Sequence, residues 1–304
     1  AAEKGVTFAQ FALGMSYENG QGVSKDEAEA VKWYRKAAEQ GNAGAKVSLA
    51  GCYLLGKGMP KNEPKAVKWL REAVAQGHAS AKYLLGRCYA KGQGVPKDEA
   101  EAAKWYRKAA DQGNASAQSA LGSFYYWGND VMQDYGESVK WYRMAADQGD
   151  AVAQCGLGVC YSKGQGGLVQ DSAQAILWHR KAAEQGFDSA QGELGGFYAR
   201  GDGLPQDYAQ AAKWFRKAAD QGNSSSQCSL GILYSKGLGV PQDYAEAGRW
   251  YRKAAEQGFA EGQCNLAGAY GMGWGLPKDN VMAYMWSNLA SASGLARAIE
   301  FRDL

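Results

Sequence analysis

Apolar side chains recur along this chain at the spacings of helix faces, in a unit that repeats from one end to the other. A typical unit has Ala81, Leu85 and Tyr89 four residues apart, which places all three on one face of a helix. A second apolar stripe follows, with Trp105 and Ala109 among its members, and it also has the helical period. The pattern therefore predicts two helices in each unit.

Tryptophans mark the length of the unit. The step from Trp33 to Trp69 is 36 residues, and the same step recurs except between Trp141 and Trp178, where it is 37. The tryptophans in this register are Trp33, Trp69, Trp105, Trp141, Trp178, Trp214, Trp250 and Trp286. A fixed period of this length predicts an all-α array of eight 36-residue helix pairs. Because they lie on the apolar stripe, we interpret these tryptophans as core residues rather than ligand-stacking groups.

Small and polar residues punctuate each unit. Gly86 follows the leucine in mid-helix, where glycine is unfavourable, and we expect close helix–helix approach to compensate. A loop with two glycines follows, and Asp98 with Glu101 has the spacing of a capping box at the start of the second helix. A phosphate-binding role for the glycine loop is disfavoured, because the loop follows a helix instead of a strand and recurs in every unit.

The period predicts a single repeat domain over residues 1–304. Residues 1–5 match the ending of later second helices, so we expect them to end a preceding repeat. Residues 6–294 hold the eight repeats, with one extra residue near Gly167 that lengthens a loop and accounts for the 37-residue step. Residues 295–304 are predicted to form a partial capping helix.

Composition narrows the possible partners. The net charge is +3, from 34 basic and 31 acidic residues scattered through every unit, so the chain has no electrostatic footprint for nucleic acid. No run approaches the ~18 apolar residues that a membrane-spanning helix needs, so no membrane insertion is predicted. The 46% hydrophobic content is ample for a packed core.

Residues capable of chemistry do not cluster in the sequence. All six cysteines fall on predicted first helices, where equivalent positions lie ~8–10 Å apart, beyond the ~7 Å that a disulfide bridges between Cα atoms. We expect free thiols, which weakly favours a reducing compartment. His78 and His179 read as repeat variants rather than catalytic groups, and no spacing fits a zinc or calcium site. The sequence therefore predicts no enzyme, no metal and no cofactor.

The repeated motif resembles the Sel-1-like repeat family. Its three parts are Ala-x-x-x-Leu-Gly-x-x-Tyr, Gly-x-Gly-Val-Pro-x-Asp and Ala-x-x-Trp-Tyr-Arg-Lys-Ala-Ala, which stand together at residues 81–89, 92–98 and 102–110. The resemblance covers essentially the whole chain. It implies a right-handed αα superhelix (solenoid) related to tetratricopeptide repeats, and a scaffold or adaptor role. Because many bacterial members look exported or host-interacting, it also favours an exported bacterial protein.

The face of the first helices opposite the leucine varies most between units. By the same resemblance, this face lines the concave side of the superhelix and binds a protein or peptide. The candidate positions run from aromatic to basic along the chain: Phe11, Met15, Leu54, Leu55, Tyr83, Arg87, Lys91, Tyr126, Trp127, Lys163, Arg200 and Lys236. The competing interpretation is that the apolar members pack against neighbouring helices, Phe11 in particular.

A non-catalytic protein-interaction scaffold is the leading function. Repeat arrays present long surfaces whose side chains vary without disturbing a shared core. The alternatives are a carbohydrate- or cell-envelope-binding module that uses the aromatic residues of the same face, and a regulatory repeat region of a larger protein. The sequence names no partner and no oligomeric state.

Overall fold

The structure is a computed structural model that describes residues 2–3, 5–128 and 132–293. These residues form helices and connecting loops, without strands. The first helices of the repeats are α1 (Thr7–Asn19), α3 (Ala43–Leu55), α5 (Ala79–Lys91), α7 (Ala115–Trp127), α9 (Ala151–Lys163), α11 (Asp188–Arg200), α13 (Ser224–Lys236) and α15 (Ala260–Met272). The second helices are α2 (Glu27–Glu39), α4 (Glu63–Ala75), α6 (Glu99–Ala110), α8 (Tyr135–Asp147), α10 (Ser172–Glu184), α12 (Tyr208–Asp220), α14 (Tyr244–Glu256) and α16 (Asn280–Ala292).

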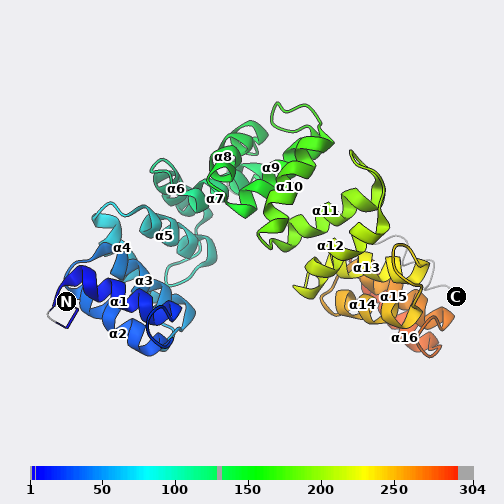
Figure 1. Ribbon diagram of the computed structural model, residues 1–304, viewed down its shortest axis with the longest axis horizontal. Helices are drawn as coiled ribbons and strands as arrows, with labels where there is room; N and C mark the ends of the chain where they lie inside the picture. The colour runs from blue at the N-terminus through cyan, green and yellow to red at the C-terminus, as the bar shows by residue number, and fades with distance from the viewer. Residues whose placement is uncertain (1, 4, 129–131, 294–304) are drawn as a thin grey trace. The chain divides into compact units, whose positions relative to one another are not determined.

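The helices pack in chain order into two compact units. Residues 1–150 with α1–α8 form one unit, and residues 151–304 with α9–α16 form the other (Figure 1). Within each unit every second helix packs against the first helix of its own repeat and against that of the next. This confirms the expected all-α solenoid of helix pairs. One uninterrupted domain, with residues 1–5 ending a preceding repeat, stays a prediction, and the capping helix expected at 295–304 lies outside the described residues.

An aromatic ring lying over a glycine holds the two helices of a repeat together. A Cβ placed on Gly86 of α5 would lie 2.9 Å from Cδ1 of Tyr106 on α6, closer than carbon atoms tolerate. The same holds for Gly14 with Tyr34, where the distance would be 2.6 Å. The glycine after the leucine is therefore explained by close helix approach, as the sequence predicted.

The two repeats that lack this glycine also lack the ring. Ala50 on α3 stands where Leu70 replaces the aromatic residue of α4. Ala267 on α15 stands where Ser287 occupies that position on α16. All four residues are fully buried. A larger residue on the first helix thus accompanies a smaller one on the second.

The tryptophans are less buried than the sequence predicted. Only Trp141 and Trp250 are buried, and the other six in the 36-residue register are half-buried. The residue after each tryptophan points into the core instead, and both belong to the same helical stripe. In five of the eight repeats a lysine three residues later lies over the tryptophan ring, as Lys108 does 4.2 Å above Trp105 and Lys253 does 4.0 Å above Trp250.

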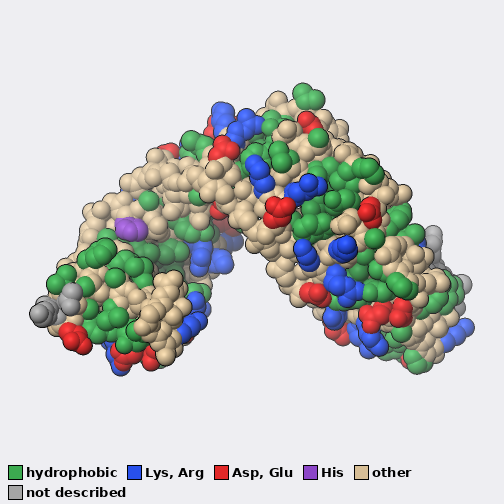
Figure 2. Space-filling view, viewed as in Figure 1, with side chains coloured by type: hydrophobic (Ala, Val, Ile, Leu, Met, Phe, Trp, Pro, Cys, Tyr) green, Lys and Arg blue, Asp and Glu red, His purple; other side chains and the backbone are tan. Residues whose placement is uncertain are grey.

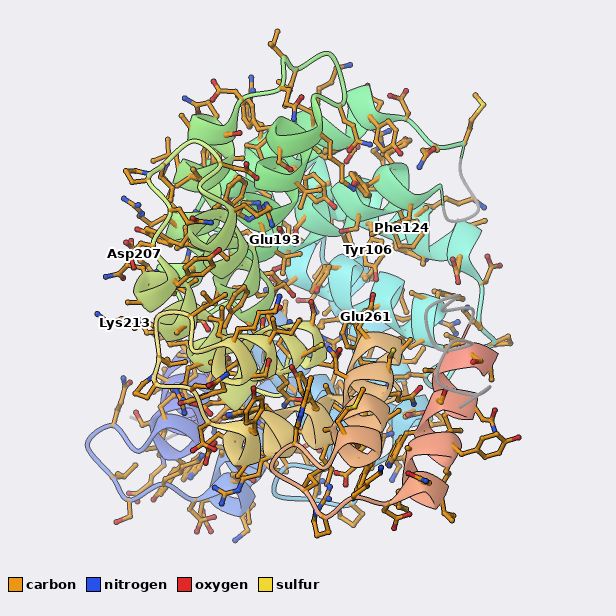
Figure 3. The ribbon with its side chains drawn as sticks, turned by 90° about the vertical axis from the view of Figure 1, so that its right-hand side faces the viewer. Tyr106, Phe124, Glu193, Asp207, Lys213 and Glu261 are labelled. Carbon is orange, nitrogen blue, oxygen red and sulfur yellow. The ribbon has the colours of Figure 1, made fainter. Side chains whose placement is uncertain are left out.

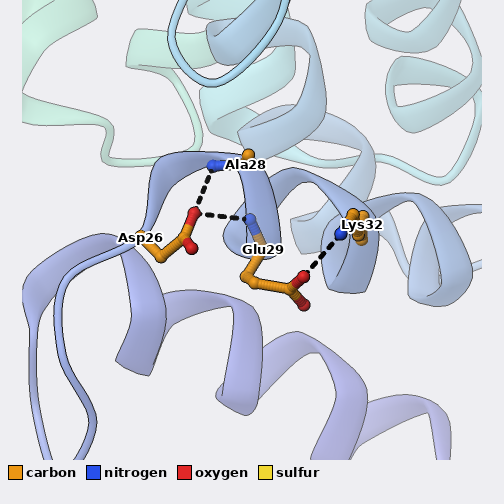
Figure 4. A network of polar contacts seen from close by, with 4 residues as sticks. All are labelled: Asp26, Ala28, Glu29 and Lys32. Carbon is orange, nitrogen blue, oxygen red and sulfur yellow. Dashed lines mark hydrogen bonds and ion pairs between the residues drawn. The ribbon is translucent and has the colours of Figure 1, made fainter.

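Loop and cap contacts fix the path between the two helices. In all eight repeats the capping residue donates its backbone N–H to the tyrosine carbonyl of the first helix, as Asp98 does to Tyr89 at 3.0 Å. Figure 4 shows one cap, where the Asp26 carboxylate accepts from the N–H groups of Ala28 and Glu29 at 2.9 and 3.0 Å. Glu29 then binds Lys32 at 2.5 Å instead of reaching back to the cap.

The expected capping box is therefore only half formed. Asp98 caps α6 by accepting from the Glu101 N–H at 2.8 Å, but the Glu101 carboxylate pairs with Lys104 at 3.0 Å. The Asp98 N–H already donates to Tyr89, so no donor is left for Glu101 to satisfy.

Buried glutamines link one repeat to the next. Gln118 on α7 donates to the Ala110 carbonyl at the end of α6, at 3.2 Å, and accepts from Gln148 after α8, at 2.7 Å. The same relay joins Gln227 to Ala219 and Gln257. The two carbonyls also accept the backbone N–H groups of Gly113 and Gly222, so each relay ties the next repeat to the turn that ends a second helix.

Filling the space above Gly86 tests the ring contact. We expect Gly86→Ala to destabilise the fold by about 2 kcal/mol, because its Cβ overpacks against Tyr106. The double variant Gly86→Ala/Tyr106→Leu copies Ala50 and Leu70 and should recover most of that loss. Urea denaturation of both variants measures this. A Gly86→Ala variant as stable as the wild type would show that the ring does not constrain this position.

Candidate functional site

The last residue of each first helix is exposed in every repeat. Each lies six positions after the core leucine, on the opposite side of the helix, and the next residue breaks the helix. We call this set the terminal row. In the N-terminal unit it comprises Asn19, Leu55, Lys91 and Trp127, and in the C-terminal unit Lys163, Arg200, Lys236 and Met272.

The predicted binding residues fall into three classes of exposure. Seven are exposed, namely Met15, Leu55, Lys91, Trp127, Lys163, Arg200 and Lys236. Phe11, Tyr83 and Arg87 are half-buried. Leu54 and Tyr126 are buried. Most exposed members thus belong to the terminal row.

The expectation that Leu54 and Tyr126 are exposed is wrong. They retain only 4% and 6% of their accessible surface. Tyr126 is covered by a residue of the second helix in its repeat. Tyr135 at the start of α8 lies edge-on to Tyr126, with ring centroids 5.2 Å apart. Neither side chain is available as a surface anchor.

Phe11 and Tyr83 contact the rings of the core layer. Phe11 lies 5.9 Å from Tyr34, and Tyr83 lies 5.7 Å from Tyr106, measured between ring centroids. Phe124 on α7 meets Tyr106 edge-on at 5.5 Å, and both are labelled in Figure 3. These half-buried rings therefore pack against neighbouring helices, as the competing interpretation of the sequence held.

Trp127 is the most prominent aromatic residue of the terminal row. It is 68% exposed, yet its ring is held edge-on against Tyr126 at 4.8 Å. Two repeats earlier Leu55 is 61% exposed, with Lys91 between them in the row. A large side chain that is exposed but held by a neighbour loses little conformational freedom on binding.

In the C-terminal unit, small side chains leave hollows in the first-helix face. Gly192 and Gly196 open a cavity of about 310 Å³ between α11 and α13, with Glu193, Arg200 and Ser229 in its wall. A second cavity, of about 280 Å³, lies between α13 and α15. The positions equivalent to Gly192 and Gly196 hold Tyr83 and Arg87 in the third repeat, where large side chains take the place of the two glycines.

Sequence reasoning missed two residues at the second cavity. Trp274, in the loop after α15, is 52% exposed and stacks on Tyr244 of α14 with centroids 5.5 Å apart. A signal was present in the sequence: of the ten tryptophans, only Trp127 and Trp274 fall outside the 36-residue register. Both are exposed.

Charged side chains of both signs lie over the C-terminal unit on the face seen in Figure 2. The terminal row is nevertheless basic in three consecutive repeats, at Lys163, Arg200 and Lys236. Arg200 pairs with Asp202 at 2.7 Å, in an exposed ion pair. Lys91 in the N-terminal unit and the exposed Met272 at the end of the row interrupt the predicted change from aromatic to basic, which stays a prediction.

The cysteines are all buried and none forms a disulfide. This confirms the expected free thiols. Burial raises the pKa of Cys52, Cys88, Cys160 and Cys228 to about 11 and that of Cys155 to about 12. Protonated, enclosed thiols are poor nucleophiles.

His179 occupies the core position under Gly158, where five other repeats hold a tyrosine or phenylalanine ring. Neither ring nitrogen has a hydrogen-bond partner among the described residues. Burial lowers the pKa of His179 to about 4, so the ring is neutral at pH 7. No group of three or more His, Cys, Asp or Glu side chains in the described ranges is placed to hold a metal ion. None of the described helices combines the length and apolar character needed to cross a bilayer.

Comparison with known proteins identifies the repeat. The Sel1 repeat model matches eight segments in succession, covering residues 7–42, 44–78, 79–114, 115–150, 151–187, 188–223, 224–259 and 260–295. The chain belongs to the Sel1 repeat family. This is a family of non-catalytic helical repeats that typically act as scaffolds for protein–protein interaction. No curated protein sequence matches this Sel1 repeat chain.

Solved structures of Sel1 repeat proteins are similar over nearly all of the chain. A Sel1 repeat protein from Oxalobacter formigenes is 33% identical, with 99% of this chain and 86% of that one covered and a TM-score of 0.67. The protein c5321, a protective antigen of uropathogenic Escherichia coli, is 34% identical, with 100% and 73% covered and a TM-score of 0.57. Human IFIT1, at 17% identity, 95% and 68% coverage and a TM-score of 0.54, shares the fold alone.

The buried neutral His179 predicts acid sensitivity. The pKa is lower in the folded chain than in the unfolded chain, so stability is complete above about pH 6.5 and falls between about pH 6.5 and 4. The loss reaches about 3 kcal/mol at the lower end. His179→Phe should remove this part of the pH dependence, because Phe215 fills the same position in the next repeat.

Urea denaturation at pH 7 and pH 4.5 compares the two proteins. The reciprocal variant Phe215→His serves as a control and should gain an acid-dependent loss of similar size. An equal drop in stability in wild type and His179→Phe would show that this ring does not titrate on unfolding.

The buried thiols predict slow modification. In native buffer at pH 8 we expect the six cysteines to react with a disulfide reagent only at the rate of local opening, and all six to react in urea. The released thiolate is followed by absorbance. A cysteine that reacts within seconds in the native protein would contradict the burial seen here.

Proposed function

We propose that this chain is a non-catalytic scaffold whose first-helix face binds a segment of another protein. In the N-terminal unit Leu55 and Trp127 serve as apolar anchors on either side of Lys91. In the C-terminal unit the basic part of the terminal row and the two cavities form the contact surface.

One observation carries the proposal: the terminal row is exposed in every repeat and differs from repeat to repeat. The ring–glycine contact, the aspartate cap and the glutamine relay use other positions of the repeat. Recognition of a specific partner requires a surface whose side chains can differ from repeat to repeat without disturbing the core. Exposed aromatic residues are also enriched at binding hot spots.

We also propose that the protein is bacterial, exported and active in contact with a host. Support comes from the 34% identity with the protective antigen of uropathogenic Escherichia coli over the full length of this chain. Fractionation of cells that express the full-length protein, followed by immunoblotting, tests the location. Recovery only with a cytoplasmic marker would contradict it.

Trp127 and its neighbour Tyr126 provide a matched pair for testing the scaffold. We expect Trp127→Ala to weaken partner binding at least fivefold without changing the melting temperature, because the side chain is exposed. Tyr126→Ala should lower the melting temperature, because that ring is buried. Partner binding is measured as the yield of adducts from a photo-crosslinking residue placed at Leu55.

The same crosslinker in place of Lys32 or Lys104, which are exposed on second helices, is the control for position. Adducts should form from Leu55 and not from these two sites. Equal yields from both faces, or a Trp127→Ala protein that loses stability but not adducts, would overturn the proposal.

A further inference from the structure

The cavity between α13 and α15 combines an apolar interior with an aromatic rim. The Tyr251 ring lies at its floor with the hydroxyl held by Ser235 Oγ at 3.2 Å, and Ile232 and Ala269 form its walls. At the rim the Tyr244 and Trp274 rings are stacked with an interplanar angle of 30°. A space of about 280 Å³ is at the small end of ligand pockets, which suits one large side chain better than a whole cofactor.

A cation stands at the same cavity. Lys236, the last residue of α13, lines it and forms no ion pair within the described part of the chain. Arg200 and Lys163 take the equivalent place in the two preceding repeats. The Arg200–Asp202 pair is exposed and contributes little, so an incoming carboxylate can compete for the guanidinium.

Helix stability alone does not account for these bases. A cation at the end of a helix complements its dipole, but α1, α3, α7 and α15 end in Asn, Leu, Trp and Met. Apart from Asp202, which pairs with Arg200, the acidic residues of α11 and α15 lie farther back from these helix ends. Glu193 and Glu261, labelled in Figure 3, precede the ends of α11 and α15 by seven and eleven residues, roughly 10 and 16 Å at 1.5 Å per residue.

We propose that this surface of the C-terminal unit binds a protein segment in which acidic residues lie next to a large apolar side chain. The apolar side chain enters the cavity beside Tyr251 and Trp274, and the carboxylates pair with Lys236 and the bases before it. The proposal rests on the scaffold function above and specifies the partner's chemistry. The first helices α13 and α15 pack against each other, and packed helices lie roughly 8–10 Å apart. An extended chain advances about 3.3 Å per residue, so residues three apart in the segment match this spacing.

Labelled peptides test this recognition directly. The first probe is a fluorescein-labelled peptide with Glu at three positions spaced three apart and Phe at the next such position, with Gly and Ser between, made in both chain directions. The second has Lys in place of Glu, and the third has Ala in place of Phe. Fluorescence anisotropy with the full chain, at low and high salt, gives the affinities. We expect the Glu/Phe peptide to bind at least tenfold tighter than the Lys version and to weaken as salt rises.

Variants assign the contacts. Lys236→Gln should weaken the Glu/Phe peptide about two- to fivefold. Trp274→Leu, which copies Leu238 from the preceding loop, should weaken it and remove the advantage over the Ala version. Lys213→Gln makes the same charge change on α12 and should have no effect, because exposed Lys213 belongs to a second helix.

Three results would overturn the proposal. They are equal binding of the Glu and Lys peptides, equal effects of Lys236→Gln and Lys213→Gln, and no loss of affinity with Trp274→Leu. Binding of chitohexaose that is lost in Trp274→Leu, without peptide binding, would make the site a glycan site instead. Leu55 lies in the N-terminal unit, so its crosslinks test the scaffold function independently of the site in the C-terminal unit. Crosslinks from Leu55 without peptide binding would contradict this inference alone.

Discussion

The ring that lies over a glycine in six of the eight repeats is the contact on which the rest of the structure depends. Because the glycine of the first helix has no side chain, the second helix comes close enough for Tyr106 or its equivalent to cover it. The two repeats without the ring carry alanine in place of glycine, with Leu70 and Ser287 opposite. The residue after the leucine on the first helix and the residue that faces it on the second helix fill the same space. A larger side chain at one of them therefore requires a smaller one at the other.

The contacts that stabilise the fold use only some positions of each repeat and leave others for recognition. The ring and glycine hold the pair, the aspartate cap and the tyrosine carbonyl close the loop, and the glutamine relay joins successive repeats. None of these uses the last residue of the first helix. The terminal row can therefore hold Leu55, Lys91 or Trp127 in the same structural setting, and the character of the surface changes along the chain at little cost to stability.

Much of the fold could be predicted because its determinants are local spacings. The period, the helix pairs, the close approach at Gly86 and the free thiols all follow from which residues share a helix face. The burial of Leu54 and Tyr126 could not be found this way, because it depends on contacts with residues outside the helix that carries each of them. The half-exposure of most tryptophans was missed for a related reason. Trp105 and Tyr106 share one apolar stripe, and helical period alone does not say which side chain lies at its centre.

The 37-residue step shows how the fold tolerates a change in length. In the fifth repeat Gly166 and Gly167 both adopt positive φ, and the Asp171 N–H still reaches the Tyr161 carbonyl at 3.0 Å. The extra residue is taken up inside the loop, Val169 projects into solvent, and the Asp171 cap and the core on either side keep their form. This loop is therefore a suitable insertion site. An epitope or a fluorophore-bearing segment can be introduced there without changing the helix pairs or the first-helix face.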